Sequence, residues 1–143
     1  MNSVYAKKRP EDLKVGDFAL FPKTVSASDV MMFSGNTGDL SPVYVNAVFG
    51  QESKFQGQVV PPMLLASMLG GAVYRLLSPD AFPLQRKFDV VKPVFAGDTV
   101  TCRAEVVEID AQKCQVTLRL EVFNSANELV LNGVSVETMD IRE

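Results

Sequence analysis

The sequence has no histidine and no tryptophan, and it has only two cysteines, Cys102 and Cys114, in 143 residues. Without histidine, a zinc or iron site would need carboxylates and thiolates alone, and the two cysteines do not have the spacing of a metal-binding motif. The sequence therefore predicts no catalytic or structural metal. The cysteines are expected to be small core residues or free thiols in a reducing compartment.

Positive charge is also scarce. The chain has 14 Lys and Arg residues against 17 Asp and Glu residues, a net charge of −3 and a pI near 5.0. The basic run at residues 7–9 is followed at once by Glu11 and Asp12, which is typical of a solvated surface. Because a nucleic-acid-binding protein needs a basic stripe to neutralise phosphates, we expect no nucleic-acid partner.

Long apolar runs are missing as well. The longest uncharged apolar stretch, residues 59–74, is interrupted by two adjacent prolines and two adjacent glycines. A membrane-spanning helix needs about 20 apolar residues. Residues 1–14 are polar and lack the apolar segment of a signal peptide. We therefore expect a cytoplasmic protein with no membrane span.

What the sequence does contain is the composition of one globular domain. Its 143 residues suffice to bury a core, and 47% hydrophobic and 22% charged residues are ordinary values for a soluble protein. No internal repeat or linker is visible. We predict a single domain over residues 1–143.

The C-terminal half alternates between apolar and polar residues, which predicts β-strands. Strands are expected over 87–94, 98–109, 114–123 and 129–141, after a short one at 18–21.

The N-terminal half is expected to be mostly helix and loop. Ser26 and Asp29 have the spacing of a capping box and predict a helix from there through about Phe33. An irregular loop over 36–43 and a short helix over 45–52 should follow.

Residues 62–77 predict the central element, one long helix that begins with a proline in its first turn. It is apolar on nearly every side until Arg75, so we expect it to be covered all round. Gly70 and Gly71 should allow a neighbouring backbone to come close. An antiparallel sheet wrapped around one buried helix is an α+β architecture with open sheet edges, which predicts a dimer with a shared sheet.

The segment Gly38-Asp39-Leu40-Ser41-Pro42-Val43-Tyr44 resembles the signature Gly-Asp-x-Asn-Pro-(Ile/Leu)-His of the MaoC-like (R)-specific enoyl-thioester hydratases. Two more segments are similar and in the right order, Phe55-Gln56-Gly57 and Pro93-Val94-Phe95-Ala96-Gly97-Asp98-Thr99. The resemblance covers residues 15–141. It implies the hot-dog fold, an acyl thioester of coenzyme A or acyl-carrier protein as ligand, and no cofactor besides.

The resemblance also implies site residues. In the family, the Asp and His hold the water that adds to the enoyl double bond, and an N–H at the start of the central helix binds the thioester oxygen. Asp39 matches the Asp, but Tyr44 replaces the His, and a phenol with a pKa near ~10 is a poor base that can still donate a hydrogen bond. Pro62 replaces the glycine and has no N–H, so Met63 is the next candidate donor.

Each candidate has two readings. Asp39 is either the base, in an apolar tunnel, or the residue that shapes the turn. Tyr44 either takes part in the chemistry or shapes the pocket. The substrate-binding candidates are Ser41, Pro62, Met63 and Leu64. Four methionines either line an acyl tunnel or fill ordinary core: Met31, Met32, Met63 and Met68. Three basic residues either contact the phosphates of coenzyme A or are solvated surface residues: Arg86, Lys87 and Lys92.

Three functions remain open. The chain is either the His-less acyl-binding subunit of a hydratase or dehydratase, a self-sufficient hydratase that uses Asp39 with Tyr44, or a non-catalytic acyl-ligand-binding module. Proline pairs like 61–62 occur in the non-catalytic halves of two-subunit dehydratases of the family, so the resemblance implies either a homodimer or a heterodimer with a His-bearing MaoC-like subunit. A thioesterase is disfavoured, because no acid lies between Glu52 and Asp80.

Overall fold

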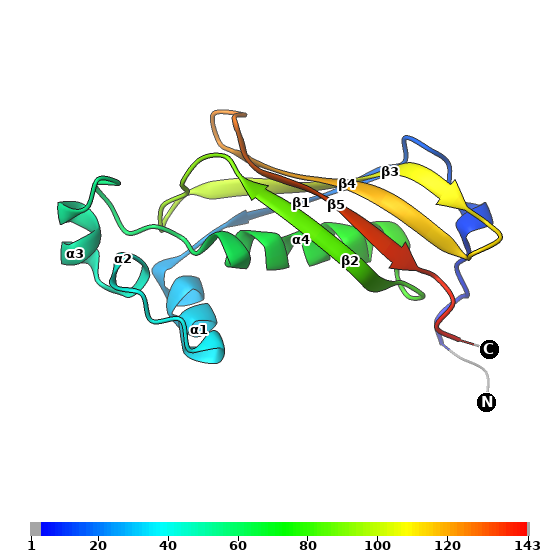
Figure 1. Cartoon of the computed structure of the whole chain (residues 1–143), viewed down its shortest axis with the longest axis horizontal. Coiled ribbons are helices and arrows are strands. Elements are labelled where there is room, and N and C mark those ends of the chain that lie inside the picture. The colour runs from blue at the N-terminus through cyan, green and yellow to red at the C-terminus, as the bar shows by residue number, and fades with distance from the viewer. Residues whose placement is uncertain (1–3, 143) are drawn as a thin grey trace.

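A five-stranded sheet and one long helix, α4, make up the body of the protein (Figure 1). The computed structural model describes residues 4–142, so residues 1–3 and 143 of the predicted domain lie outside it. The elements in chain order are a 3-10 helix (Pro10–Asp12), β1 (Phe18–Thr24), α1 (Ala27–Thr37), α2 (Pro42–Val45), α3 (Ala47–Glu52), α4 (Pro62–Leu77), β2 (Phe82–Val90), β3 (Thr99–Asp110), β4 (Gln115–Asn124) and β5 (Leu129–Thr138).

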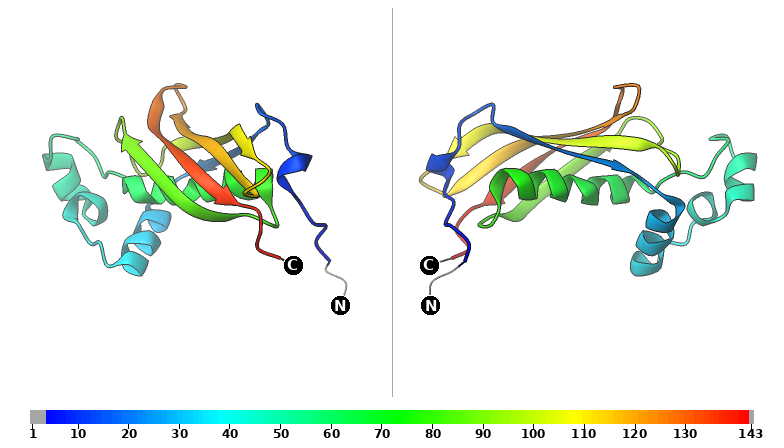
Figure 2. Two further views of the ribbon diagram at one scale, coloured as in Figure 1. Left: turned by 45° about the vertical axis from the view of Figure 1, so that its right-hand side comes forward. Right: turned by 180° about the vertical axis from the view of Figure 1, so that it is seen from behind.

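The sheet curls around α4, as predicted. Its order is β1-β3-β4-β5-β2, and all four neighbouring pairs are antiparallel. Two further views show α4 lying along the concave face of the sheet (Figure 2). The predicted alternation holds, because the inward residues of β3 and β4 are buried: Val100, Cys102, Ala104, Val106, Val116, Leu118, Leu120 and Val122. Strands β1 and β2 form the open edges.

Helix α4 has the predicted bounds, but the prediction that it is covered all round is wrong for the single chain. Its core face packs chiefly against β1 and β3. On the other side Met63 is 50% exposed and Tyr74 is 66% exposed, because the sheet wraps around only one side of the helix. None of the helices in residues 4–142 is long and apolar enough to cross a membrane.

The two helix glycines have different surroundings from those predicted. A Cβ on Gly71 would lie 2.8 Å from the Phe21 ring, so this glycine accommodates an aromatic side chain of β1 rather than a backbone. A Cβ on Gly70 would meet nothing within 4 Å. The close approach of α4 and β1 therefore depends on Gly71 and the Phe21 ring alone, and not on Gly70.

Some predicted boundaries were wrong by a few residues. Helix α1 has the predicted capping box, but it continues to Thr37 and ends at Gly38, whose φ of 77° suits glycine. Pro42 begins the short helix α2 inside the predicted loop. Strand β2 runs from Phe82 to Val90 instead of over 87–94, since the chain leaves the sheet after Val90.

Both cysteines are free, as expected. Cys102 is a buried core residue of β3, and burial raises the pKa of its thiol to about 12. Cys114 is half-buried at the turn before β4.

The two ends of the described chain meet at Asp80, just after α4. The buried Asp80 carboxylate accepts hydrogen bonds from Arg142 Nη2 and the Lys8 backbone N–H, both at 2.7 Å, and from Arg142 Nε. Arg142 also donates to the Tyr5 and Ala6 carbonyls at 3.3 and 3.4 Å. These contacts, named here the Asp80 clasp, lower the pKa of Asp80 to about 2, chiefly through the hydrogen bonds from Arg142.

We expect Asp80→Asn to lower the free energy of unfolding by about 1–3 kcal/mol at pH 7, because the change weakens charge-assisted bonds at a buried position. The depressed folded-state pKa means that the carboxylate stabilises the fold fully above its unfolded pKa of ~3.9. Wild type should therefore lose this stability between about pH 4 and pH 2. Urea denaturation at both ends of this range measures it.

The matched control is Asp89→Asn, since the Asp89 side chain is exposed and accepts no hydrogen bond within residues 4–142, while its backbone pairs with Asn132 in either variant. It should leave the urea midpoint unchanged. Equal midpoints for Asp80→Asn and wild type at pH 7 would show that the clasp does not stabilise the fold.

Candidate functional site

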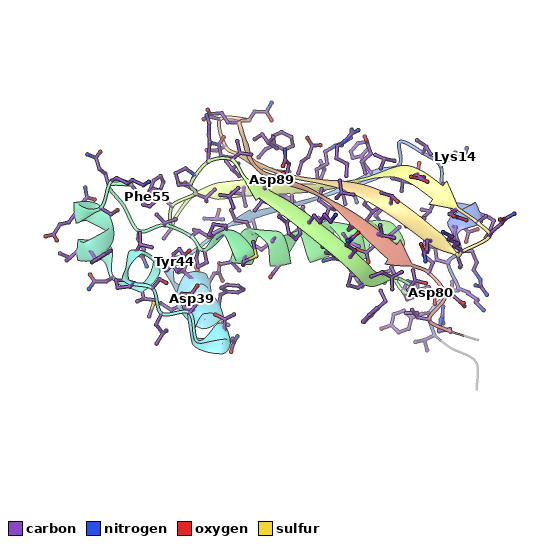
Figure 3. The ribbon with its side chains drawn as sticks, viewed as in Figure 1. Lys14, Asp39, Tyr44, Phe55, Asp80 and Asp89 are labelled. Atoms are coloured by element: carbon purple, nitrogen blue, oxygen red, sulfur yellow. The ribbon has the colours of Figure 1, made fainter. Side chains whose placement is uncertain are left out.

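The signature segment forms the turn between α1 and α2, beyond the end of the sheet (Figure 3). Asp39 Oδ1 accepts hydrogen bonds from the Ser41 hydroxyl at 2.6 Å and from the Ser41 N–H at 3.2 Å. Pro42 then begins α2. The turn-shaping reading of Asp39 is therefore visible in its contacts, and Ser41 is its partner.

Asp39 is exposed in the single chain, so the expected apolar tunnel around its carboxylate is not formed by this chain alone. Its second oxygen, Oδ2, has no hydrogen-bond partner within residues 4–142. That oxygen can accept a hydrogen bond from a water or a ligand. The catalytic reading thus keeps one available atom.

Tyr44 forms part of a pocket of about 290 Å³ between α2, the start of α4 and the loop after β2. We call it the Tyr44 pocket. Lys92 is its one charged residue, and its lining is otherwise apolar apart from the tyrosine hydroxyl: Val43, Tyr44, Phe55, Val59, Pro62, Val90, Val91, Lys92 and Pro93. Such a pocket suits a hydrocarbon chain with few polar groups.

The Tyr44 hydroxyl stays protonated at neutral pH. Partial burial raises its pKa above the usual 10, and the nearby Asp39 carboxylate adds to the shift. Figure 3 shows both residues at the same end of the molecule. A protonated phenol can donate a hydrogen bond, but it cannot take a proton from water.

Hydrogen bonds hold the three family-like segments together around this pocket. Gln58 Nε2 donates to the Tyr44 carbonyl at 2.7 Å, and the Val59 N–H donates to the Val43 carbonyl at 3.1 Å. Val59 also pairs with Phe95 in an isolated β-bridge. The signature segment is thus fixed to the chain on both sides of α4.

A glycine and a turn fix the third segment. A Cβ on Gly57 would lie 2.8 Å from the Phe95 ring, so the position needs a glycine. Asp98 Oδ2 accepts from the Phe95 N–H at 2.9 Å. The interpretation of Asp98 as a turn residue is confirmed.

The predicted site residues do not all meet in one place. Tyr44 and Pro62 share the Tyr44 pocket, and Asp39 and Ser41 share the adjacent turn. Leu64 lies elsewhere, in a groove of about 240 Å³ beside α1 whose other residues are Lys23, Asp29, Met32, Phe33, Asn36 and Met68. Met32 and Met68, two of the methionines predicted for an acyl tunnel or for core, also line this groove.

Met63 presents the free N–H at the start of α4. Pro62 has no N–H, and the Leu64 N–H donates to the Pro61 carbonyl at 2.9 Å. No acceptor within residues 4–142 binds the Met63 N–H. Because the first turn of a helix carries positive potential, this donor suits a developing negative charge.

The other candidate side chains do not all follow the two sequence readings. Met31, Met32 and Met63 are 49–66% exposed, so they are not core. Arg86 is bound to the buried Glu137, a contact that neither reading predicted. Lys92 pairs with Glu128 at the rim of the Tyr44 pocket.

Residues 16–126 match the family model described as "MaoC like domain". The chain belongs to the MaoC-like family. It is similar to an (R)-specific enoyl-CoA hydratase of Rhodospirillum rubrum, with 32% identity over 124 residues that cover 86% of this chain and 85% of the relative.

Solved structures agree with this assignment. The (R)-hydratase of Aeromonas caviae involved in PHA biosynthesis has a TM-score of 0.86 at 27% identity, with 90% of this chain and 98% of that chain covered. A 3R-hydroxyacyl-ACP dehydratase complex of Mycobacterium tuberculosis, HadBC, shares the fold with a TM-score of 0.72 at 17% identity, over 87% of this chain and 96% of that chain. The predicted family and hot-dog fold are confirmed.

The chain differs from the signature named above at several positions, among them Ser41 and Tyr44. It has no histidine, and residue 44 of the signature is a tyrosine. Within residues 4–142, no group of three or more Cys, Asp or Glu side chains is placed to hold a metal ion. At the signature segment and the start of α4, the chain offers the Tyr44 hydroxyl, the Asp39 carboxylate and the Met63 N–H.

Proposed function

We propose that this MaoC-like domain is a cytoplasmic acyl-thioester-binding subunit in the hydration of enoyl thioesters, or the reverse dehydration of 3-hydroxyacyl thioesters. The thioester is carried by coenzyme A or by acyl-carrier protein. A second MaoC-like subunit supplies the Asp–His pair. The observation that carries the proposal is an apolar pocket with a protonated Tyr44 hydroxyl where the family places a histidine.

The Tyr44 pocket supports the binding part of the proposal. Each methylene of an acyl chain that leaves water for such a pocket contributes about 0.8 kcal/mol. The Tyr44 hydroxyl and the Met63 N–H are two neutral donors near the start of α4, and a thioester carbonyl can accept from either one. The chain can therefore hold an acyl thioester without performing the reaction.

The need for a partner follows from the chemistry. Adding water to an enoyl thioester requires a base that takes a proton from the water. Tyr44 keeps its own proton, and Asp39 is exposed and engaged by Ser41. The half-exposed Met63 and the exposed Tyr74 on α4 offer apolar surface for a second chain to cover. A homodimer would cover the same surface without supplying a histidine.

Co-expression with a His-bearing MaoC-like protein encoded beside this chain tests the proposal. A stable heteromer should form, and it should hydrate a trans-2-enoyl-CoA, followed as loss of the conjugated-thioester absorbance. The isolated chain should bind acyl-CoA without turnover. Efficient hydration by the isolated chain, together with failure to bind the partner, would disprove the proposal.

A self-sufficient hydratase is the second candidate, favoured by the free Oδ2 of Asp39 beside Tyr44. In that case Asp39→Asn in the isolated chain should lower the hydration rate by ~10²–10⁴-fold, because a general base is lost. Tyr44→Phe should cost only about 2–10-fold, the value of one neutral hydrogen bond. Under the subunit proposal, Asp39→Asn leaves the rate of the heteromer unchanged.

The third candidate, a non-catalytic acyl-ligand-binding module, predicts saturable acyl-CoA binding and no turnover with any family partner. Acyl-CoA binding by the isolated chain and hydration with and without the partner therefore separate all three functions.

A further inference from the structure

A second cavity lies at the other end of α4, where the helix ends and the chain turns into β2. Its volume is about 180 Å³, and we call it the Glu137 cavity. It shares no residue with the Tyr44 pocket, and Gly70, its first α4 residue, lies eight residues or about 12 Å along the helix from Pro62 of that pocket. The lining residues are Gly70, Val73, Tyr74, Ser78, Pro79, Ala81, Pro83, Arg86 and Glu137.

The sheet register turns two charged side chains of this cavity toward α4. Glu137 on β5 is opposite Val116, a buried inward residue of β4. Arg86 on β2 is opposite Ser135, which lies two residues before Glu137 and so on the same face of the strand. An ion pair thus occupies positions that the alternation of the sheet reserves for core residues.

Glu137 is only half satisfied by this pair. Arg86 donates from Nε at 3.0 Å and from Nη2 at 2.7 Å, and both bonds end on Oε1. The Glu137 side chain is completely buried, and its Oε2 has no hydrogen-bond partner within residues 4–142. The buried Ser135 Oγ beside it is also unpartnered there. An unpaired buried carboxylate oxygen is costly, so a donor from outside these residues is called for.

The charges around Oε2 select the kind of donor. A metal ion or an ammonium group would lie beside the Arg86 guanidinium, and an anion would meet Glu137. A neutral hydroxyl avoids both conflicts. Its hydrogen can go to Oε2 while its oxygen accepts from Arg86, whose Nη1 makes no hydrogen bond within residues 4–142. Most of the remaining lining is apolar and suits a carbon skeleton.

We infer that the Glu137 cavity is a ligand site for a small alcohol, held by a hydroxyl between Glu137 and Arg86 with its carbon skeleton against the end of α4. This inference does not rest on the Tyr44 pocket, since neither residue belongs to it. Tyr74 lines the cavity and is also part of the α4 surface proposed for the partner, so the test uses the isolated chain.

Titration of the ¹⁵N-labelled full chain with three five-membered-ring probes tests the inference. Cyclopentanol has a hydroxyl, tetrahydrofuran accepts but cannot donate, and pyrrolidine is a cation at neutral pH. Cyclopentanol should shift the amide signals of Arg86 and Glu137 saturably, and tetrahydrofuran should bind at least tenfold more weakly. Equal binding of the first two, tighter binding of pyrrolidine, or no saturable shift would each overturn the inference.

Two variants complete the test. Glu137→Gln should weaken cyclopentanol binding tenfold or more, while Glu108→Gln, the same change at an exposed carboxylate, should not alter it. If Glu137→Gln fails to fold, Gly70→Leu serves instead, because a Cβ at Gly70 meets no atom within 4 Å and the larger side chain occupies the cavity. Unchanged cyclopentanol binding by Gly70→Leu would place the ligand elsewhere.

Discussion

Val91→Trp is expected to weaken the binding of octanoyl-CoA roughly fifty-fold while leaving acetyl-CoA binding unchanged. Val91 lies in the wall of the Tyr44 pocket and is 48% exposed, so the fold can accept a larger side chain there. An indole in the pocket should exclude about three methylenes of a medium-length chain. At about 0.8 kcal/mol each, their loss amounts to about 2.4 kcal/mol. Isothermal titration with both thioesters measures the difference.

Val134→Trp is the matched control. Val134 is 47% exposed, but it lies on β5 and does not line the Tyr44 pocket. This variant should bind octanoyl-CoA as wild type does. If Val91→Trp also binds it normally, the acyl chain does not enter the Tyr44 pocket, and the binding half of the proposed function is wrong.

Tyr44→His is expected to give the isolated chain a hydration rate ~10²-fold above the uncatalysed background. An imidazole with a pKa near ~6.5 can accept a proton from water at neutral pH, whereas the Tyr44 phenol cannot. The other catalytic groups of the family mechanism are already present, since the Asp39 carboxylate is close enough to raise the pKa of Tyr44 and the Met63 N–H is free. Hydration of a short enoyl-CoA, followed by absorbance, measures the gain.

Two features would identify the new activity as imidazole catalysis. The rate should fall below about pH 6.5 as the imidazole becomes protonated, and Asp39→Asn in the Tyr44→His background should remove most of the gain. Tyr44→Phe serves as the control and should show no gain. A Tyr44→His chain that folds and binds octanoyl-CoA but stays inactive would mean that this chain lacks more than a base.

The sequence was informative wherever a local pattern determines the structure. Pro62 and the apolar run after it defined α4, and the alternation from Val116 to Val122 defined the inner face of β4. The capping box of Ser26 and Asp29 also appeared as predicted. In each case the residues that form the element are neighbours along the chain.

The sequence was silent where the structure depends on distant contacts. A hydrophobic pattern shows that α4 is apolar but not which side its own sheet covers, so the exposure of Met63 and Tyr74 was missed. The packing of Phe21 on Gly71 joins residues that are 50 positions apart, and no local signal marks it.

The site was only partly predictable, because a motif is visible in the sequence but contacts between distant segments are not. The signature segment identified Asp39, Ser41 and Tyr44, but the walls of the Tyr44 pocket come from residues 55–62 and 90–93, which only the fold brings together. The inward position of Glu137 could have been predicted from the alternation of β5. Counting every second residue from the apolar Leu131 on β5 places it on the inner face.

The Asp80 clasp has a practical consequence for joining two subunits. Because it holds residues 5–8 beside Arg142, any segment attached at either end of the chain leaves the molecule on the side opposite α1–α3 (Figure 1). A tether placed there stays clear of the Tyr44 pocket. Fusing a His-bearing partner through such a tether would turn a bimolecular encounter into an intramolecular one, with an effective concentration in the millimolar range for a short flexible linker.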